Sequence, residues 1–295
     1  MKRLTSNIIK LSLIVFFLLG LGFAGAKSSM AATYFVDGIA GDDGGAGTVD
    51  SPWKTINQAL KHARESDVIY IRYAVYNETI NLAPIPLRGI SLIGIPQEGN
   101  RPVIHSSSPN KDTIFLVNFT GVIKGLDITG ATDAIGINCV ANDGVNVAEI
   151  SDCYIYGNSM GIHATTVGTN PSECSPMIHH NYIFSNSARG IGNMGHATPT
   201  IAYNVIYENG SGGMGEGGIG VTNEAKPKII GNLIFNNNDA GISMNSLASP
   251  EIVNNTIYGN NGNTPISAGI RCGQDDAITS VKIENNIIVN NARGI

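Results

Sequence analysis

A pattern of nine apolar and polar positions recurs six times in the second half of the chain. It reads Ile-x-x-Asn-x-Ile-x-x-Asn, and its copies begin at Ile150, Ile178, Ile201, Ile229, Ile252 and Ile283. The copy at Ile150 has Cys153 in the first asparagine position. A Gly-Ile pair follows each copy after a spacer of variable length. A constant core with variable spacers is typical of a solenoid whose loops lie on one side.

Successive copies start 28, 23, 28, 23 and 31 residues apart, which is too irregular for helical repeats. The short internal spacings favour strands broken by bends. Isoleucine suits the inside of a pleated wall, and asparagine tolerates a left-handed bend and can bond to neighbouring backbone. With coils stacked about 4.8 Å apart, each inward Asn would bond to the Asn of the next coil. The pattern therefore predicts an all-β fold, a right-handed parallel β-helix with three short strands per coil.

Upstream of the repeat, the sequence indicates earlier coils and a cap. A weaker copy begins at Ile123, and apolar runs at 68–71 and 90–95 suggest less regular coils. Over 52–64 the apolar residues recur with helical spacing, which predicts a short capping helix with Ser51 as N-cap and Trp53 as a plug. The aspartates between 37 and 50 favour turns, with calcium binding as the alternative.

The two ends of the chain carry further signals. Lys2, Arg3 and Lys10 precede an apolar run over 11–23 and small residues at 24–26, which is typical of a secretory signal peptide. We expect cleavage after residue 26 or near residue 31, no membrane span in the mature chain, and a secreted protein, extracellular or periplasmic. The mature chain then has an N-terminal cap over 33–66 and a β-helix over 67–295. Because the last coil ends without a polar cap, we expect a chain truncated at its C-terminus.

Composition limits the partners and the cysteine chemistry. The formal net charge is -5 and no basic patch is present, so nucleic acid is not an expected partner. Cys153 falls in an inward position, and Cys139 and Cys272 point inward about 24 Å apart, too far for a disulfide. We therefore expect buried free thiols at these three positions. Cys174 falls in a loop.

Several segments carry a family resemblance. They are Ser51-Pro52-Trp53-Lys54-Thr55-Ile56, Asp67-Val68-Ile69-Tyr70-Ile71 and Tyr76-Asn77-Glu78. Together they resemble the N-terminal module of secreted bacterial β-helix proteins, including those similar to family 9 polysaccharide lyases. The Asn-Ile coils resemble the repeat of lyases, mannuronan epimerases and NosD-type periplasmic proteins. The resemblance implies the fold over almost the whole mature chain, but it implies little chemistry, because the matching residues are those that build coils.

The resemblance to family 9 lyases implies a lysine base beside a calcium ion held by aspartates. Asp275 and Asp276 are the only adjacent acidic pair in the regular coils, and we take them as candidate calcium ligands. Arg271, nearby in the sequence, is a candidate catalytic residue that would face a uronate. Lys228 and Lys282 each precede an inward isoleucine, so they point outward and are candidate bases. The alternative for both lysines is a solvated charge on the outer wall.

Two other groups of polar residues suggest different chemistry. Glu251 and Glu284 are expected in one outer row of adjacent coils, within reach of the carboxylate spacing of a glycosidase or as part of a charge ladder with lysines. His163 and the pair His179 and His180 fall in neighbouring coils, where imidazoles could bind a transition metal. They are expected on different walls of the coil, which disfavours a shared site.

An aromatic residue follows the middle isoleucine in five consecutive coils. These residues are Tyr156, Phe184, Tyr207, Phe235 and Tyr258. Alternation along the strand places them outside, one rung apart, where they would stack. They are candidate substrate-binding residues that offer flat faces to sugar rings, and bracing of the coils is the alternative.

These observations lead to three hypotheses for function. The first is binding or cleavage of an extracellular, acidic polysaccharide, with β-elimination as its most specific form. The second is a non-catalytic, adhesin-like or structural surface protein that docks through the aromatic row. The third is a NosD-like periplasmic accessory role.

Overall fold

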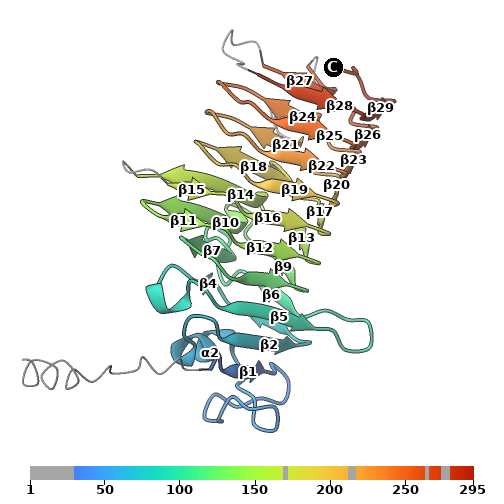
Figure 1. Cartoon of the computed structure of the whole chain (residues 1–295). Coiled ribbons are helices and arrows are strands. Elements are labelled where there is room, and N and C mark those ends of the chain that lie inside the picture. The colour runs from blue at the N-terminus through green and yellow to red at the C-terminus, as the bar shows by residue number, and fades with distance from the viewer. Residues whose placement is uncertain (1–29, 169–171, 212–216, 263–265, 274–279) are drawn as a thin grey trace, which may run out of the picture. The chain divides into compact units, whose positions relative to one another are not determined.

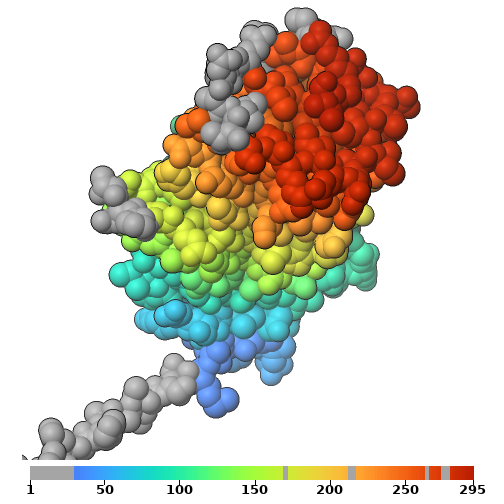
Figure 2. Space-filling model, turned by 45° about the horizontal axis from the view of Figure 1, so that its top comes forward, coloured from blue at the N-terminus to red at the C-terminus, as the bar shows by residue number. Residues whose placement is uncertain are grey.

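Three long sheets of parallel strands wind into stacked coils and form a parallel β-helix (Figure 1). The computed structural model describes residues 30–168, 172–211, 217–262, 266–273 and 280–295. Residues 31–295 form one unit. Neighbouring strands come from successive coils, so the chain colours follow one another in bands along the stack (Figure 2). The predicted all-β fold is therefore confirmed, and the predicted signal peptide over 1–26 lies outside the described residues.

The three long sheets are the walls of the β-helix. The ten-stranded sheet contains β1 (Thr33–Val36), β2 (Val68–Arg72), β5 (Ser91–Ile95), β8 (Val122–Lys124), β12 (Glu149–Ser151), β16 (Met177–His179), β19 (Thr200–Ala202), β22 (Lys228–Ile230), β25 (Glu251–Val253) and β28 (Lys282–Glu284). The nine-stranded sheet contains β3 (Val75–Asn77), β6 (Val103–His105), β9 (Asp127–Thr129), β13 (Tyr154–Tyr156), β17 (Tyr182–Phe184), β20 (Val205–Tyr207), β23 (Leu233–Phe235), β26 (Thr256–Tyr258) and β29 (Ile287–Val289). The eight-stranded sheet contains β4 (Ile80–Asn81), β7 (Ile114–Val117), β10 (Ile135–Asn142), β14 (Met160–Val167), β18 (Ile191–Met194), β21 (Gly217–Val221), β24 (Ala240–Met244) and β27 (Ala268–Cys272). The remaining elements are the paired strands β11 (Val145–Asn146) and β15 (Glu173–Cys174), the helix α2 (Ile56–His62) and the 3-10 turn η1 (Ile85–Leu87).

The isoleucines of the repeat form continuous buried rows. Ile178, Ile201, Ile229 and Ile252 pair in register in the ten-stranded sheet and are fully buried. The second isoleucine of each copy forms a row in the nine-stranded sheet, and that of the Gly-Ile pair forms one in the eight-stranded sheet. The weaker upstream copy continues the first row at Ile123. The rows fill the core because β-branched side chains pack closely on a pleated wall.

Two buried ladders of asparagine side chains run along the stack, as the sequence predicted. In the first ladder, Asn181, Asn204, Asn232 and Asn255 are at most 1% exposed. The Oδ1 atoms of Asn204, Asn232 and Asn255 each accept hydrogen bonds from the backbone N–H and the Nδ2 of the Asn one coil earlier, at 2.9–3.0 Å. Cys153 takes the ladder position in its own coil, where its N–H donates to Asn181 at 2.9 Å. The second ladder contains Asn158, Asn186, Asn209, Asn237, Asn260 and Asn291.

The left-handed backbone at each corner falls on the residue before the ladder asparagine. In the first ladder φ is 55° at His180, 57° at Tyr203 and 66° at Gly231. Among the described residues, no ladder asparagine has a positive φ. The sequence argument was therefore right about bonding to backbone and wrong about which residue bends. The ladder holds the asparagine inward, so its neighbour, exposed at His180 and Tyr203, absorbs the turn.

The glycine of each Gly-Ile pair lies against the second ladder. A Cβ on Gly218 would come within 2.4 Å of the carbonyl oxygen of Gly241 and 3.1 Å of the Nδ2 of Asn237. The equivalent glycines at 136, 161, 190, 241 and 269 meet the same kinds of atom. A side chain has no space here, which explains why glycine is constant in the repeat.

Helix α2 adds its buried side chains to the N-terminal end of the core, but it begins later than the sequence indicated. Its N-cap is Thr55 rather than Ser51, because Trp53 is still extended and forms a bridge with Val36. Trp53 is nevertheless only 3% exposed, so it fills the end of the core as predicted. Strand β1 pairs with β2, so the predicted cap over 33–66 already contains the first strand of the ten-stranded sheet.

All four cysteines are free thiols. Cys139 and Cys153 are fully buried, and burial raises the pKa of Cys153 to about 12. The expectation of burial is wrong for Cys272, which is exposed, because β27 is the last described strand of its sheet and no further strand covers it. Cys174 lies in β15 rather than in a loop and is fully buried.

Candidate functional site

Five aromatic side chains form a stacked row on the outside of the nine-stranded sheet. We call this row the aromatic strip, and it consists of Tyr156, Phe184, Tyr207, Phe235 and Tyr258. Adjacent ring centroids lie 5.0–5.1 Å apart, and adjacent ring planes differ by 4–13°. Strand pairing keeps the rings in register, because a buried isoleucine directly precedes each ring. The five rings therefore lie on the outer face of the sheet, one rung apart, as the alternation of inward and outward residues along the strand predicted.

The ring faces in the strip are turned towards one another, and the ring edges towards solvent. Near-parallel rings at these separations are offset-stacked. Phe184, Tyr207 and Phe235 each have a neighbour on both faces. The expectation of flat, open faces is therefore wrong for the interior of the strip. What the strip presents outward is ring edges and, at the tyrosines, hydroxyl groups.

The hydroxyls of Tyr156, Tyr207 and Tyr258 recur at every second coil. Within the described residues, none of these three hydroxyls forms a hydrogen bond with a protein group. None of them is enclosed in the protein as a buried, unpaired polar atom either. Burial raises the pKa of Tyr156 and of Tyr207, so these phenols stay protonated around neutral pH. A protonated phenol both donates and accepts, so the hydroxyls are available to a polar ligand.

A second outward row lies beside the strip in the same sheet. Tyr154 and Tyr182 have ring centroids 4.8 Å apart at an interplanar angle of 56°, and Tyr182 is 41% exposed. The guanidinium of Arg101 lies 4.6 Å from the Tyr154 ring centroid and donates to Asp127 at 2.8 Å. The row continues with Val205 and Leu233. The outer face of the nine-stranded sheet is therefore largely apolar beside the strip, and the charge of Arg101 is neutralised by its ion pair with Asp127.

The candidate bases Lys228 and Lys282 lie outside the ten-stranded sheet, in one row with Glu251. The Nζ of Lys282 lies 2.8 Å from a carboxylate oxygen of Glu251 and 3.2 Å from one of Glu284. Hydrogen bonds to these two groups raise the pKa of Lys282, which makes it a poor base. Among the described residues, Lys228 forms no ion pair. The sequence suggested that Glu251 and Glu284 share one outer row. This expectation is wrong, because Glu284 pairs with Val253 and Glu251 pairs with Lys282.

Arg271 lies on a different wall from the candidate bases. It points outward from β27 in the eight-stranded sheet, and its guanidinium lies 2.5 Å from a carboxylate oxygen of Asp239. Asp239 is 1% exposed and also accepts a hydrogen bond from the hydroxyl of Ser267 at 3.3 Å. The fold therefore does not bring Arg271 beside Lys282. Asp275 and Asp276 lie outside the described residues, and their calcium site stays a prediction.

Three polar side chains outside the eight-stranded sheet form a hydrogen-bonded chain. The Nδ2 of Asn138 donates to Asp112 at 2.8 Å, and the Oδ1 of Asn138 lies 3.3 Å from the Nδ1 of His163. Because a carboxamide oxygen only accepts, the Nδ1 of His163 donates to it. Burial lowers the pKa of His163, so the imidazole is neutral around neutral pH and its Nε2 keeps a lone pair. This oriented imidazole can accept a proton.

The sequence pattern did not lead us to predict these hydrogen bonds among Asp112, Asn138 and His163, although the positions of two of the three residues indicate them. Asn138 and His163 each directly follow the isoleucine of a Gly-Ile pair, and they pair one coil apart. The register therefore places the two side chains together. Asp112 lies in an irregular upstream coil, where no repeat fixes its position.

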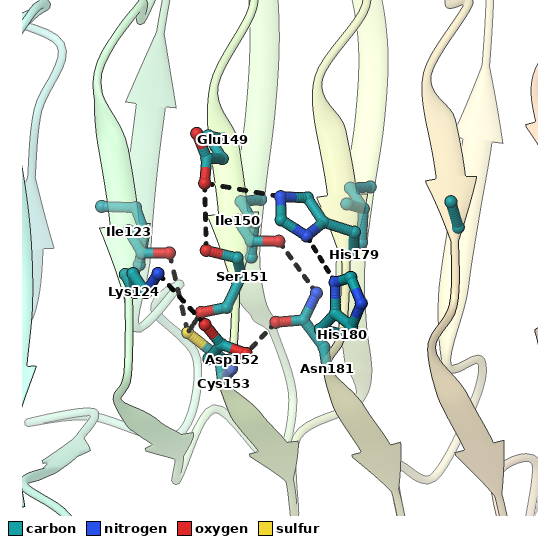
Figure 3. A network of polar contacts seen from close by, with 12 residues as sticks. Ile123, Lys124, Glu149, Ile150, Ser151, Asp152, Cys153, His179, His180 and Asn181 are labelled. Atoms are coloured by element: carbon teal, nitrogen blue, oxygen red, sulfur yellow. Dashed lines mark hydrogen bonds and ion pairs between the residues drawn. The ribbon is translucent and has the colours of Figure 1, made fainter.

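His179 and His180 belong to a separate polar network on the ten-stranded sheet (Figure 3). The Nε2 of His179 lies 3.4 Å from a carboxylate oxygen of Glu149, to which the hydroxyl of Ser151 also donates at 3.2 Å. The Nδ1 atoms of His179 and His180 lie 2.8 Å apart, so only one of them carries a proton in this contact. His163 is on another wall. Within the described ranges, no three His, Cys, Asp or Glu side chains are grouped as metal ligands.

Carboxylates of the N-terminal stretch accept hydrogen bonds from backbone N–H groups. Asp37 accepts hydrogen bonds from the N–H groups of Ile39 and Ala40, at 2.9–3.0 Å. Asp43 accepts from the N–H of Thr55 at 2.9 Å and from its hydroxyl at the same distance. The contacts of Asp37 are the turn role that the sequence favoured, whereas Asp43 connects its loop to Thr55, the N-cap of helix α2.

Comparison with known proteins shows the family. The model of the right-handed β-helix region family matches residues 136–295, and the chain belongs to this family. Among solved structures, the chain is similar to XylC in complex with xylose, with 13% identity and a TM-score of 0.61 over 86% of this chain and 64% of that chain. It is also similar to pectate lyase Pel9A, with 14% identity and a TM-score of 0.53 over 88% of this chain and 78% of that chain. At these identities the likeness shows the fold alone.

The chain spans 64% of the length of the xylose-bound structure. No curated protein matches it. In the part of the chain that the structure describes, no helix is both long and apolar enough to cross a membrane.

Proposed function

We propose that this protein is secreted and binds an extracellular polysaccharide along the outer face of the nine-stranded sheet. The observation that carries the proposal is the aromatic strip, in which free hydroxyls at a regular spacing adjoin an apolar row. A large outward apolar surface with a polar margin commonly marks a binding site. The structures with a similar fold include a xylose complex and a pectate lyase, which supports a carbohydrate ligand.

Removing rings from the strip tests this proposal. In an affinity gel that contains polysaccharide, Tyr207→Ala and Tyr258→Ala should each weaken retention by about 1 kcal/mol, the scale of an aromatic contact. Tyr203→Ala is the matched control. Tyr203 is 59% exposed, but it directly follows β19 of the ten-stranded sheet and does not belong to the strip. Retention that stays unchanged while both strip variants melt earlier would show that the strip only braces the coils. The adhesin-like or NosD-like hypothesis would then replace polysaccharide binding.

Elimination on an acidic polysaccharide is a catalytic form of the proposal that uses a different wall from the strip, because the candidate base Lys228 lies in β22 of the ten-stranded sheet. It needs a base and a cation that neutralises the uronate carboxylate. Lys228 is better suited than Lys282 to be the base, because two carboxylates stabilise the ammonium form of Lys282. With calcium and a uronate polymer, absorbance from new unsaturated ends should rise and should be lost in Lys228→Ala. The catalytic form fails if the intact protein gives no such absorbance, and binding is then tested by retention alone.

A further inference from the structure

The aromatic strip alternates tyrosine and phenylalanine along the stack. All five rings stack with nearly the same separation and angle. Stacking alone does not need the hydroxyls, because Phe184 and Phe235 occupy the same row without them. The hydroxyls of Tyr156, Tyr207 and Tyr258 recur at every second rung, which is about 9.6 Å at the rung spacing of a β-helix.

This period matches the geometry of one class of polysaccharide. An extended chain of equatorially 1,4-linked pyranoses advances per residue by nearly the length of one rung. Successive sugars in such a chain face alternately to opposite sides, so the same ring edge returns at every second sugar. The period of the hydroxyls is therefore the period of that edge.

We propose that the aromatic strip binds an extended, equatorially 1,4-linked polysaccharide that lies along the axis of the β-helix. The hydroxyls of Tyr156, Tyr207 and Tyr258 bond to every second sugar, and the edges of Phe184 and Phe235 contact the sugars between them. The spacing is preorganised, because both asparagine ladders fix the distance between coils. This inference rests on the proposed function and names its substrate class.

Two rearranged strips with equal numbers of hydroxyls test the period. In the first, Tyr156→Phe, Tyr207→Phe and Tyr258→Phe are combined with Phe184→Tyr and Phe235→Tyr, which leaves two hydroxyls two rungs apart. In the second, Tyr156→Phe and Tyr258→Phe are combined with Phe184→Tyr, which leaves two hydroxyls on neighbouring rungs. Since each hydrogen bond contributes about two- to tenfold in affinity, the first strip should bind a linear hexasaccharide more tightly than the second. Both keep every ring, so their melting temperatures should agree.

The probes are hexamers of β-1,4-linked mannuronate and α-1,4-linked guluronate, which have equal charge and differ in the geometry of their linkages. Calorimetric titration of the wild-type protein should show tighter binding of the mannuronate hexamer, which has equatorial linkages. Equal affinities for the two hexamers, or equal binding by the two rearranged strips, would overturn the inference. If Tyr207→Ala still weakened retention in that case, polysaccharide binding by the strip would stand without the hydroxyl period.

Discussion

A ladder asparagine in the interior of the stack connects three coils. The Nδ2 of Asn204 donates to the carbonyl oxygen of Ile178 in the coil before and to the Oδ1 of Asn232 in the coil after, at 2.9 and 3.0 Å. Its own Oδ1 accepts from the N–H and the Nδ2 of Asn181. The side chain thereby satisfies the polar groups that each corner would otherwise leave buried and unpaired.

Replacing one ladder asparagine by an apolar residue of similar size tests this role. We expect Asn232→Leu to lower the free energy of unfolding by about 1–3 kcal/mol, because the amides of Asn204 and Asn255 each lose a buried partner. Urea unfolding measures the change. The control is Asn238→Leu at a nearby exposed position, where we expect little effect. Equal stability of the two variants would contradict the ladder.

The partly buried imidazole of His163 predicts a pH dependence of stability. Its folded pKa lies below the unfolded value of about 6.5, because burial disfavours the charged form. As the pH falls below that value, the unfolded chain binds a proton that the folded chain does not, so stability decreases. His163→Gln should remove this part of the decrease between neutral and mildly acidic pH in urea unfolding. The control is His196→Gln at an exposed histidine, and a wild-type slope in His163→Gln would contradict the prediction.

At the scale of the element, each coil combines a constant wall with loops of variable length. Consecutive coils stay in register although their starts are 23 to 31 residues apart. The register is set where backbone and side chains meet closely, at the ladders and at the glycines beside them. Loop length can vary because loops of neighbouring coils need not pair.

The glycine row gives a direct test of this close approach. Gly218→Ala would place a Cβ within 2.4 Å of the carbonyl oxygen of Gly241, and the two coils would have to separate. We expect a loss of about 1–3 kcal/mol, the usual cost of overpacking, measured as a lower urea midpoint. The control is Gly44→Ala, whose Cβ would meet its nearest atom at 3.5 Å. The close approach would be refuted if both variants were equally stable.

At the scale of the whole molecule, the stack is held by repeated contacts between coils and not by covalent links among the described residues. All four cysteines are free. In a solenoid each repeat contacts only its neighbours, so stability is a sum of local contributions. The isoleucine rows and the asparagine ladders make these contacts inside the stack. The outer faces of the sheets therefore remain free for binding.

Thiol chemistry tests this organisation. In the native protein a thiol reagent should modify Cys272 alone, and Cys139, Cys153 and Cys174 should react only after denaturation, since they are fully buried. A reductant should leave the melting temperature unchanged. A large loss of stability on reduction would reveal a disulfide and contradict the register of the coils.

The sequence by itself determined the winding of the coils. The isoleucines and asparagines keep a fixed spacing within the copies, with Cys153 as the one replacement, and a Gly-Ile pair follows every copy. Each of these residue types has a local physical reason to be there. Ile229 must be buried, Asn232 must bond along the stack, and Gly218 must allow close approach. Local spacing was therefore enough to predict the fold, the inward rows and the outward aromatic strip.

Only the tertiary structure decided which polar groups meet and how the aromatic rings lie. Three of these contacts join residues from different coils: the ion pair of Lys282 with Glu251, that of Arg271 with Asp239, and the hydrogen bond between Asn138 and His163. The strip showed edges instead of faces once its ring planes were known. These features depend on side-chain torsions and on the paths of loops of unequal length, which no spacing in the sequence specifies.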